Sequence, residues 1–145
     1  MDFFTAMDIA SSGLKAQRKN MNTISMNLAN VQTTRTQDGG PYQRKEVLFE
    51  SAPIQHPFDQ VMTSEMQREV KGVKVSRIEE DDRAFKNVYE PGHPDANEKG
   101  YVKYPDINVV EEMANMLTAT RTYEANLSTI SSVKQMINQA VQIGR

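Results

Sequence analysis

Two heptad-spaced apolar series, one near each end of the chain, restrict the fold more than any other feature of the sequence. The first series occupies positions 3, 7, 10, 14, 17, 21, 24, 28 and 31, and Gln17 is its one polar member. Steps of four and three residues place these side chains on a narrow stripe of a helix, which packs against another helix. At about 1.5 Å per residue this helix reaches roughly 45 Å, which is more than a compact domain of this size needs.

The second series occupies positions 109, 113, 116, 120, 123, 127, 130, 134, 137 and 141, with Thr120 and Lys134 as its polar exceptions. A further partial stripe widens the apolar surface beyond the area that one partner helix covers. Its residues are Val110, Ala114, Leu117, Val133, Met136, Ala140 and Ile143. This helix is therefore predicted to contact more than one neighbour. The residues predicted to form the interhelical core and the assembly contacts are Leu14, Met21, Ile24, Leu28, Met113, Met116, Tyr123, Leu127 and Ile130.

The segment between the two series is typical of short strands and loops. Gly39-Gly40-Pro41 breaks the first helix, and strands are predicted over residues 42–49, 70–78, 84–89 and 101–104. Residues 50–69 are predicted to be a loop or a short helix, and their role stays open. The sequence thus predicts an α+β fold with an N-terminal assembly helix over 1–35, a β-rich middle module with long loops over 36–105 and a C-terminal assembly helix over 106–145.

Composition excludes several classes of function. The 145-residue chain has no cysteine, which removes disulfides and thiolate chemistry, and its net charge of −2 comes without a basic stripe for a nucleic acid. The N-terminal residues lack the basic start and the apolar run of a cleaved signal peptide. No stretch approaches the roughly 20 apolar residues that span a bilayer. A role outside the cytoplasm therefore requires another export route.

No residue pattern indicates a catalytic, cofactor or metal site. The two histidines, His56 and His93, each precede a proline and lack the third ligand that a metal site requires, so exposed turn positions are expected. The acidic run at residues 79–82 lacks the alternating ligands and the glycine of a calcium loop, and a solvated charge run is expected. The chain is therefore predicted to have no catalytic residue, no cofactor, no metal and no small-molecule substrate.

Glycine and asparagine in the predicted helices require a reason, because both residues disfavour helix formation. Gly13 indicates either close approach of a neighbouring helix or a local weakness, and the sequence leaves both open. Polar contacts between subunits, or alternatively solvation, would account for the asparagines. The residues predicted to make polar inter-subunit contacts are Asn27, Asn30, Asn108 and Asn126.

Two groups of residues resemble the flagellar axial proteins, the family of rod and hook subunits. The N-terminal group is Ser12-Gly13-Leu14-Lys15-Ala16-Gln17 followed by residues 24–33, with Met26 where the family more often has Asn. The C-terminal group comprises residues 100–105, 108–113, 115–117 and 121–126, which are similar to small proximal-rod members of the family. The similarity covers about residues 1–49 and 98–145.

The resemblance implies a structural rod subunit whose terminal helices pair as a coiled coil and pack into the inner tube of the rod. It further implies torque transmission, an export channel lined by the rod, copies of itself and other rod proteins as partners, and passage through the flagellar type III export apparatus. The expected location is the periplasmic rod of the basal body, reached without a cleaved signal peptide. Two alternatives stay open, namely another small rod protein and a soluble helical adaptor or chaperone.

Overall fold

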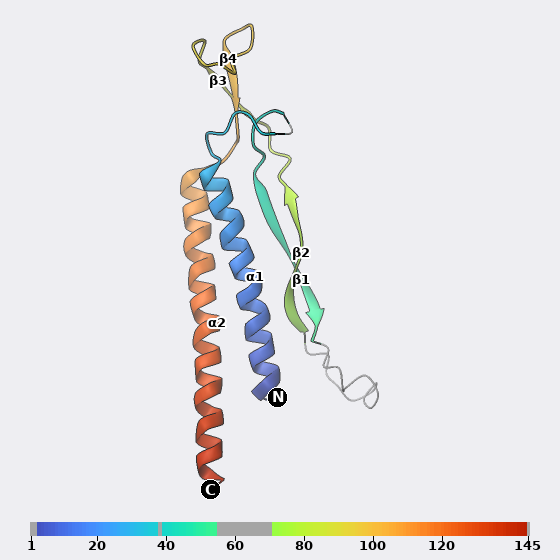
Figure 1. Cartoon of the computed structure of the whole chain (residues 1–145), viewed down its shortest axis with the longest axis vertical. Coiled ribbons are helices and arrows are strands. Elements are labelled where there is room, and N and C mark those ends of the chain that lie inside the picture. Colours follow the sequence, from blue (N-terminus) through green and yellow to red (C-terminus); the bar gives the residue numbers. More distant parts are fainter. Residues whose placement is uncertain (1–2, 38, 55–70, 145) are drawn as a thin grey trace.

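A computed structural model describes residues 3–37, 39–54 and 71–144. The chain forms two long antiparallel helices and two β-hairpins (Figure 1). The prediction of an α+β fold, with long terminal helices around a small antiparallel β middle, is confirmed. The division of the chain into domains at residues 35 and 105 stays a prediction. The elements in chain order are α1 (Phe3–Ala29), β1 (Lys45–Pro53), β2 (Lys71–Glu80), β3 (Lys86–Tyr89), β4 (Tyr101–Tyr104) and α2 (Val109–Ile143).

Helix α2 begins and ends at residues suited to these positions. The side chain of Asn108 accepts a hydrogen bond from the backbone N–H of Val110 at 3.0 Å, which satisfies one of the free donors of the first turn. Glu111 and Glu112 lie in the same turn, where the helix dipole favours negative charge. At the other end Gly144 follows the last helical residue, and its N–H donates to the carbonyl of Ala140.

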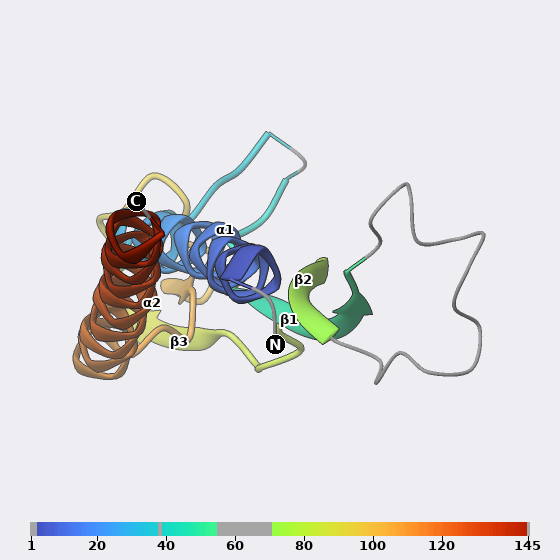
Figure 2. The same cartoon turned by 90° about the horizontal axis from the view of Figure 1, so that it is seen from below.

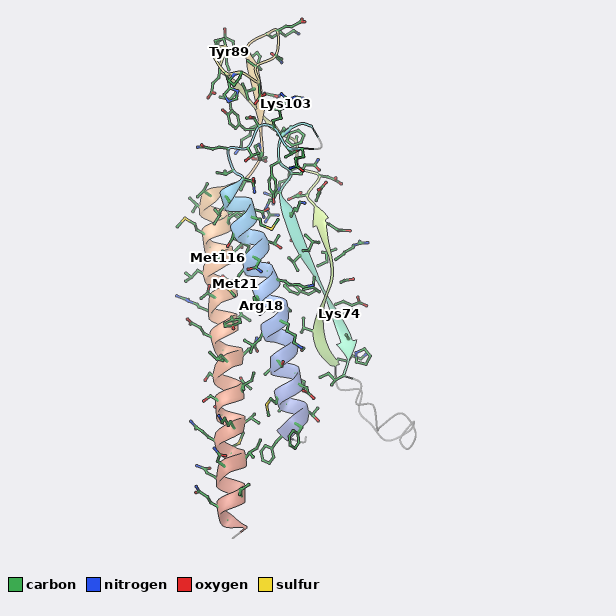
Figure 3. All side chains as sticks on the ribbon, in the orientation of Figure 1. Arg18, Met21, Lys74, Tyr89, Lys103 and Met116 are labelled. Atoms are coloured by element: carbon green, nitrogen blue, oxygen red, sulfur yellow. The ribbon has the colours of Figure 1, made fainter. Side chains whose placement is uncertain are left out.

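The two helices pair in a constant antiparallel register. Gly13 lies against Asn126, because a Cβ atom added to this glycine would lie 2.9 Å from the Asn126 amide nitrogen. Asn27 donates to Glu112 at 3.1 Å. The first pair lies 14 residues from the second along each helix, which is two heptads. The helices therefore follow the spacing of a coiled coil. Met21 and Met116 lie on the facing sides of the two helices between these pairs (Figure 3).

Helix α1 lies between α2 and the β1–β2 hairpin (Figure 2), and it packs against both. Strand β1 pairs antiparallel with β2, with an irregularity in the register between Leu48 and Phe49. The hydroxyl of Ser12 accepts a hydrogen bond from the backbone N–H of Val73 at 3.0 Å, which fixes the hairpin to the helix. Val47 of β1 is buried, whereas most other strand side chains are half-buried or exposed.

The second hairpin, β3–β4, lies at the end of the molecule where α1 ends and α2 begins (Figure 1). Val102 of β4 is fully buried, and Ile107 continues this small core toward the start of α2. Gly100 has φ of +77°, which a residue with a side chain rarely adopts, and it places the backbone close to the ring of Tyr89. The loop of residues 90–100 is therefore closely packed against the end of β3 where it enters β4.

Strand β1 begins and ends later than the sequence pattern predicts. The structure places it at Lys45–Pro53 and not at residues 42–49, because the side chains of Tyr42 and Arg44 turn inward to polar partners. The strand extends through Pro53 at its end, where pairing with Lys71 closes the ladder. The predicted loop or short helix over 50–69 is thus a strand over residues 50–53, and its part from residue 55 onward lies outside the described residues.

Candidate assembly site

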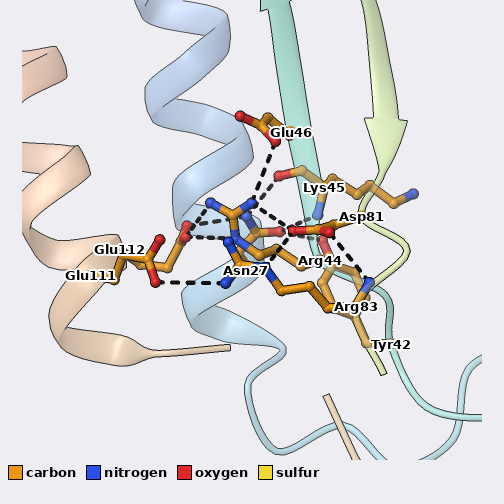
Figure 4. Close-up of polar contacts among 9 residues, drawn as sticks. All are labelled: Asn27, Tyr42, Arg44, Lys45, Glu46, Asp81, Arg83, Glu111 and Glu112. Carbon is orange, nitrogen blue, oxygen red and sulfur yellow. Dashed lines mark hydrogen bonds and ion pairs between the residues drawn. The ribbon is translucent and has the colours of Figure 1, made fainter. Parts of the chain in front are cut away.

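A buried polar cluster joins the end of α1, the start of α2 and the residues just before β1 and just after β2 (Figure 4). Two of its side chains, Asn27 and Glu112, are each only 1% exposed. Buried polar groups require hydrogen-bond partners, since an unpaired donor or acceptor costs free energy. The polar cluster consists of Asn27, Tyr42, Arg44, Asp81 and Glu112.

Arg44 connects the two acidic side chains of this cluster. Its Nε donates to Glu112 Oε1 at 2.9 Å, its Nη2 lies 2.8 Å from the same oxygen, and its Nη1 donates to Asp81 Oδ2 at 3.1 Å. Burial alone would lower the pKa of the Arg44 guanidinium, but the hydrogen bonds to Glu112 and Asp81 and the charges of Glu112 and Glu46 together outweigh burial and raise the pKa. Arg44 therefore stays charged and holds the start of α2 against the hairpin.

Asn27 satisfies both ends of its amide within the chain. Its Nδ2 donates to the carbonyl of Lys45 at 2.9 Å and to Glu112 Oε2 at 3.1 Å. Its Oδ1 accepts from the Lys45 N–H at 2.9 Å and from the Tyr42 hydroxyl at 3.0 Å. Burial raises the pKa of Tyr42, and the charges of Glu112 and Glu80 raise it further, so the neutral hydroxyl is favoured. These bonds hold α1, the start of β1 and the start of α2 together. They also use both the amide oxygen and the amide nitrogen of Asn27 within the fold.

Helix α2 has two faces with different surroundings. The face toward α1, the covered face, takes positions 112, 116, 119, 123, 126, 130, 133 and 137, all of which are buried or half-buried. The adjacent face, the uncovered face, follows the same spacing from position 110 to 141 and carries large exposed apolar side chains. Their exposed fractions are Val110 75%, Met113 60%, Leu117 54%, Leu127 52% and Val141 62%. One helix partner therefore leaves much of the apolar surface of α2 open.

The structure separates the residues that the sequence analysis predicted as one interhelical seam. Ile24 is buried, and the other predicted residues of α1 are half-buried beside their neighbours. Met113 and Leu127 do not lie between α1 and α2; they belong to the uncovered face. Their predicted part in assembly stays a prediction. The predicted members of the seam that are buried or half-buried are Leu14, Met21, Ile24, Leu28, Met116, Tyr123 and Ile130.

The seam of α2 differs from the predicted one because two of its residues are polar and face a small or polar residue of α1. Position 126 is an asparagine that contacts Gly13, and position 112 is a glutamate that receives the hydrogen bond of Asn27. A pattern of large apolar residues omits both positions and selects instead the residues that follow them, Met113 and Leu127. Two residues of the true seam, Ala119 and Val133, are each 3% exposed.

The predicted polar contact residues have partners in their own chain. Asn27 belongs to the polar cluster, Asn108 caps α2, and Asn126 packs on Gly13. Asn30 donates to the carbonyl of Met26 at 2.8 Å and accepts from the Thr33 hydroxyl at 3.1 Å. A contact of Asn27 with another subunit would have to replace its four internal bonds, and inter-subunit roles for these residues stay predictions.

Sequence reasoning missed Tyr42, Arg44, Asp81 and Glu112 as members of one cluster. Asp81 was expected in a solvated charge run, yet its side chain is only 18% exposed and pairs with Arg44. A signal was available in the first turn of α2, where one of two adjacent glutamates falls on the face of the helix that packs inward. Single-sequence patterns do not reveal the partner of a charged residue that is 68 positions away.

The described part of the chain has no group of three or more potential metal ligands. His93, the histidine within it, accepts a hydrogen bond from the N–H of Asp95 at 3.1 Å, and its ring lies edge-on to Tyr104. His56 lies outside the described residues. Within the described ranges, neither helix combines the length and apolar character that crossing a bilayer requires.

Family models match both ends of the chain. Residues 7–36 match the model of the flagella basal body rod protein, and residues 98–143 match the model of the flagellar basal body rod FlgEFG protein C-terminal region. These two segments include most of α1 and all of α2, and hence both sides of the interhelical seam. The matches therefore coincide with the elements that pair in the structure.

Curated relatives match the whole chain. The flagellar basal-body rod protein FlgC of Borreliella burgdorferi is 42% identical over 151 aligned residues, with 99% of this chain and 98% of the relative covered. The proteins of the same name from Bacillus subtilis and Salmonella typhimurium are 39% and 38% identical, with full coverage of both chains in each case. The chain therefore belongs to the flagellar basal-body rod protein FlgC family and is a structural subunit of the bacterial flagellar rod.

Proposed function

We propose that the uncovered face of α2 is the surface through which this subunit packs against its neighbours in the rod, both copies of itself and other rod proteins. The observation that carries the proposal is the row of exposed Val110, Met113, Leu117, Leu127 and Val141 along one side of the helix. Exposed apolar patches on soluble proteins commonly mark interaction surfaces, and this row is interrupted only where Thr120, Glu124, Ser131, Lys134 and Asn138 take the same spacing. Its heptad spacing fits another helix better than it fits a loop or a small molecule.

Burial of this row would release enough free energy to stabilise an interface. Each large aliphatic side chain contributes about 1.5–3 kcal/mol when it passes from water to a fully buried site. The five side chains are already between 25 and 48% covered in the single chain, so the remaining gain is a fraction of that amount. Several kcal/mol from each copy is sufficient because every subunit in a polymer repeats the contact.

The lengths of the helices support the same proposal. Helix α2 has 35 residues and α1 has 27, so α2 continues past the beginning of α1 (Figure 1). Ile143 in the last turn is 87% exposed. The C-terminal turns of α2 therefore have no partner among the described residues of the chain, and we assign their cover to a neighbouring subunit.

In the proposed assembly the paired helices form the inner layer that lines the export channel, and the hairpins face outward. Long helices packed side by side resist twisting, which suits a part that transmits torque from the motor. The subunit would reach the periplasmic rod through the flagellar type III export apparatus and perform no catalysis. Its fully paired polar cluster supports a structural role, because the hydrogen-bonding groups that converge there are used within the fold.

The substitution Leu127→Asp tests the proposal. A carboxylate on the uncovered face leaves the single chain folded, because this position is 52% exposed, but it puts a charge into the proposed interface. We expect rod assembly and swimming to be lost while the exported protein is still detected. Normal rods with Leu127→Asp would contradict the proposal.

Two controls accompany this test. Ser128→Asp introduces the same charge at the next position of α2, which is exposed on another side of the helix, and it should leave rods intact. His56→Ala combined with His93→Ala should also leave rods and swimming unchanged, since the proposed function assigns no role to either histidine. Loss of rods in the histidine variant would reopen a chemical role for the chain.

A further inference from the structure

The turn of the β3–β4 hairpin is rigid although it projects from the end of the molecule. We call residues 89–101 the β3–β4 tip. The side-chain oxygen of Asn97 accepts from the N–H groups of Lys99 at 3.0 Å and Tyr101 at 2.9 Å. The N–H of Glu90 donates to the carbonyl of Gly100 at 2.9 Å. A preordered loop loses little conformational entropy when it binds a partner.

This rigid tip presents two tyrosines and a negative charge to solvent. Tyr89 and Tyr101 are 63% and 43% exposed, and their rings meet edge to face with centroids 5.3 Å apart. The tip has three acidic side chains and one basic side chain, Lys99, so its net charge is −2. Tyrosines on a rigid support are typical of the residues that contribute most to protein interfaces. The acidic side chains are Glu90, Asp95 and Glu98, and all three are exposed.

A groove with the opposite character lies between α1 and β2. Its volume is about 490 Å³, and three exposed lysines, Lys15, Lys19 and Lys74, line it together with a single acidic residue, Asp8. Among the described residues, these lysines form no ion pair. Apolar side chains lie between them, from Ala16, Ile54, Val73 and Val75. We call this site the basic groove.

We propose that the β3–β4 tip of one subunit docks into the basic groove of a second copy of this chain. The acidic side chains of the tip would pair with the lysines, while the two tyrosines would cover the apolar residues between them. Complementary charge favours this partner over a basic or neutral one. The inference rests on the proposed function, since it concerns contacts between subunits that the uncovered face of α2 brings together.

The positions of the two surfaces give the contact a direction. Tyr89 lies at the end of the molecule away from both termini, whereas Lys74 lies beside α1 on the first hairpin (Figure 3). The tip and the groove are different surfaces, so docking one into the other makes a heterologous contact that leaves a free tip and a free groove. Such contacts continue from copy to copy in open helical assemblies. A rod with a fixed polarity requires contacts of this kind.

Cysteine cross-linking tests the contact directly, because the natural chain contains no cysteine. Two differently tagged copies are expressed together, one with Lys74→Cys and the other with Glu98→Cys, and isolated rods are oxidised. We expect a disulfide-linked dimer that carries both tags. The matched control replaces Glu98→Cys with Glu111→Cys, an exposed acidic position on α2 outside the uncovered face, and should give no mixed dimer.

Because the cross-link is scored in rods that have formed, its absence would contradict this inference and leave the proposed function standing. An equal yield with Glu111→Cys would also contradict it. A disulfide that joins the Lys74→Cys variant to a different rod protein would contradict it as well. Failure of the proposed function has another signature, namely normal rods with Leu127→Asp. The two ideas are therefore tested separately.

Charge reversal supplies a second test. Lys15→Glu with Lys74→Glu should lower the number of rods by about tenfold, and Glu90→Lys with Glu98→Lys should do the same, because either change places like charges opposite each other. All four substitutions in one chain should restore rods to near the natural level, since every copy then has a basic tip and an acidic groove. Failure of the combined variant, when each pair alone is defective, would overturn the proposed pairing.

Discussion

The two long helices differ in how much of their surface the rest of the chain covers. Helix α1 has α2 on one side and the β1–β2 hairpin on another, whereas α2 packs against α1 alone among the helices and strands of the described chain. Small residues such as Ala10 and Ala16 are buried in α1, and its partners approach closely. Helix α2 keeps large apolar residues in solvent. A subunit that polymerises needs both, one helix to organise its own fold and one to meet its neighbours.

Removing the charge of Glu112 should have the largest effect on the covered side of the molecule. Glu112→Ala leaves Arg44 buried with one carboxylate fewer and removes a hydrogen bond from Asn27. We expect the free energy of unfolding to fall by about 3–5 kcal/mol, as when one partner of a buried ion pair is deleted. Chemical denaturation followed by circular dichroism measures this change.

The adjacent glutamate provides the matched control. Glu111→Ala removes a side chain that is 44% exposed and pairs with Arg83 at 3.6 Å, so it should change the free energy of unfolding by less than about 1 kcal/mol. Equal losses for the two variants would show that the polar cluster does not hold α2 in place.

A bulky residue at Gly13 should break the register of the two helices. In Gly13→Leu the added side chain meets the Asn126 amide, and we expect a loss of about 1–3 kcal/mol together with defective rods. Gly13→Leu combined with Asn126→Ala makes room at this point and should recover most of both losses. A full loss in the double variant would place the cause outside this contact and favour a local weakness of the helix.

Two valines of α2 compare its covered and uncovered faces with the same substitution. Val133 is 3% exposed and Val141 is 62% exposed. Val133→Ala should lower the free energy of unfolding by about 2 kcal/mol, because it removes buried methyl groups, whereas Val141→Ala should change it by less than about 0.5 kcal/mol. Thermal unfolding of the purified variants gives both values, and the reverse order would contradict the assignment of the faces.

Substitution of Tyr42 should have the smallest effect near neutral pH, and the stabilising contribution of Tyr42 should be lost in alkali. Tyr42→Phe removes one hydrogen bond to Asn27 and should cost about 1 kcal/mol at pH 7. The pKa of Tyr42 is raised above its ordinary value of 10.0, chiefly by burial, so its contribution is complete below that pH and is lost as the pH rises through the folded pKa. Between pH 8 and 12 the free energy of unfolding should fall more steeply for the natural chain than for Tyr42→Phe. Parallel curves for the two proteins would contradict this.

The helices and the hairpin arms could be predicted because periodicity records them locally. The heptad series of α1 holds from Phe3 to Leu28, and alternation over Val73 and Val75 indicated β2. In α2 the apolar pattern indicated Met113 and Leu127, each one residue after the true seam positions, because Glu112 and Asn126 belong to the seam and are not apolar. The polar cluster was out of reach, since Arg44 and Glu112 lie 68 residues apart and each alone is typical of a solvated surface.

Solvent access at the uncovered face in monomers and in rods tests the central claim most directly. Single-cysteine variants Leu117→Cys and Leu127→Cys, with Val133→Cys as the buried reference, are treated with a maleimide before and after assembly. The account predicts rapid labelling of positions 117 and 127 in the monomer, strong protection of both in isolated rods, and slow labelling of position 133 in both states. Equally rapid labelling of positions 117 and 127 in intact rods would show that no neighbour covers this face, and would contradict the account.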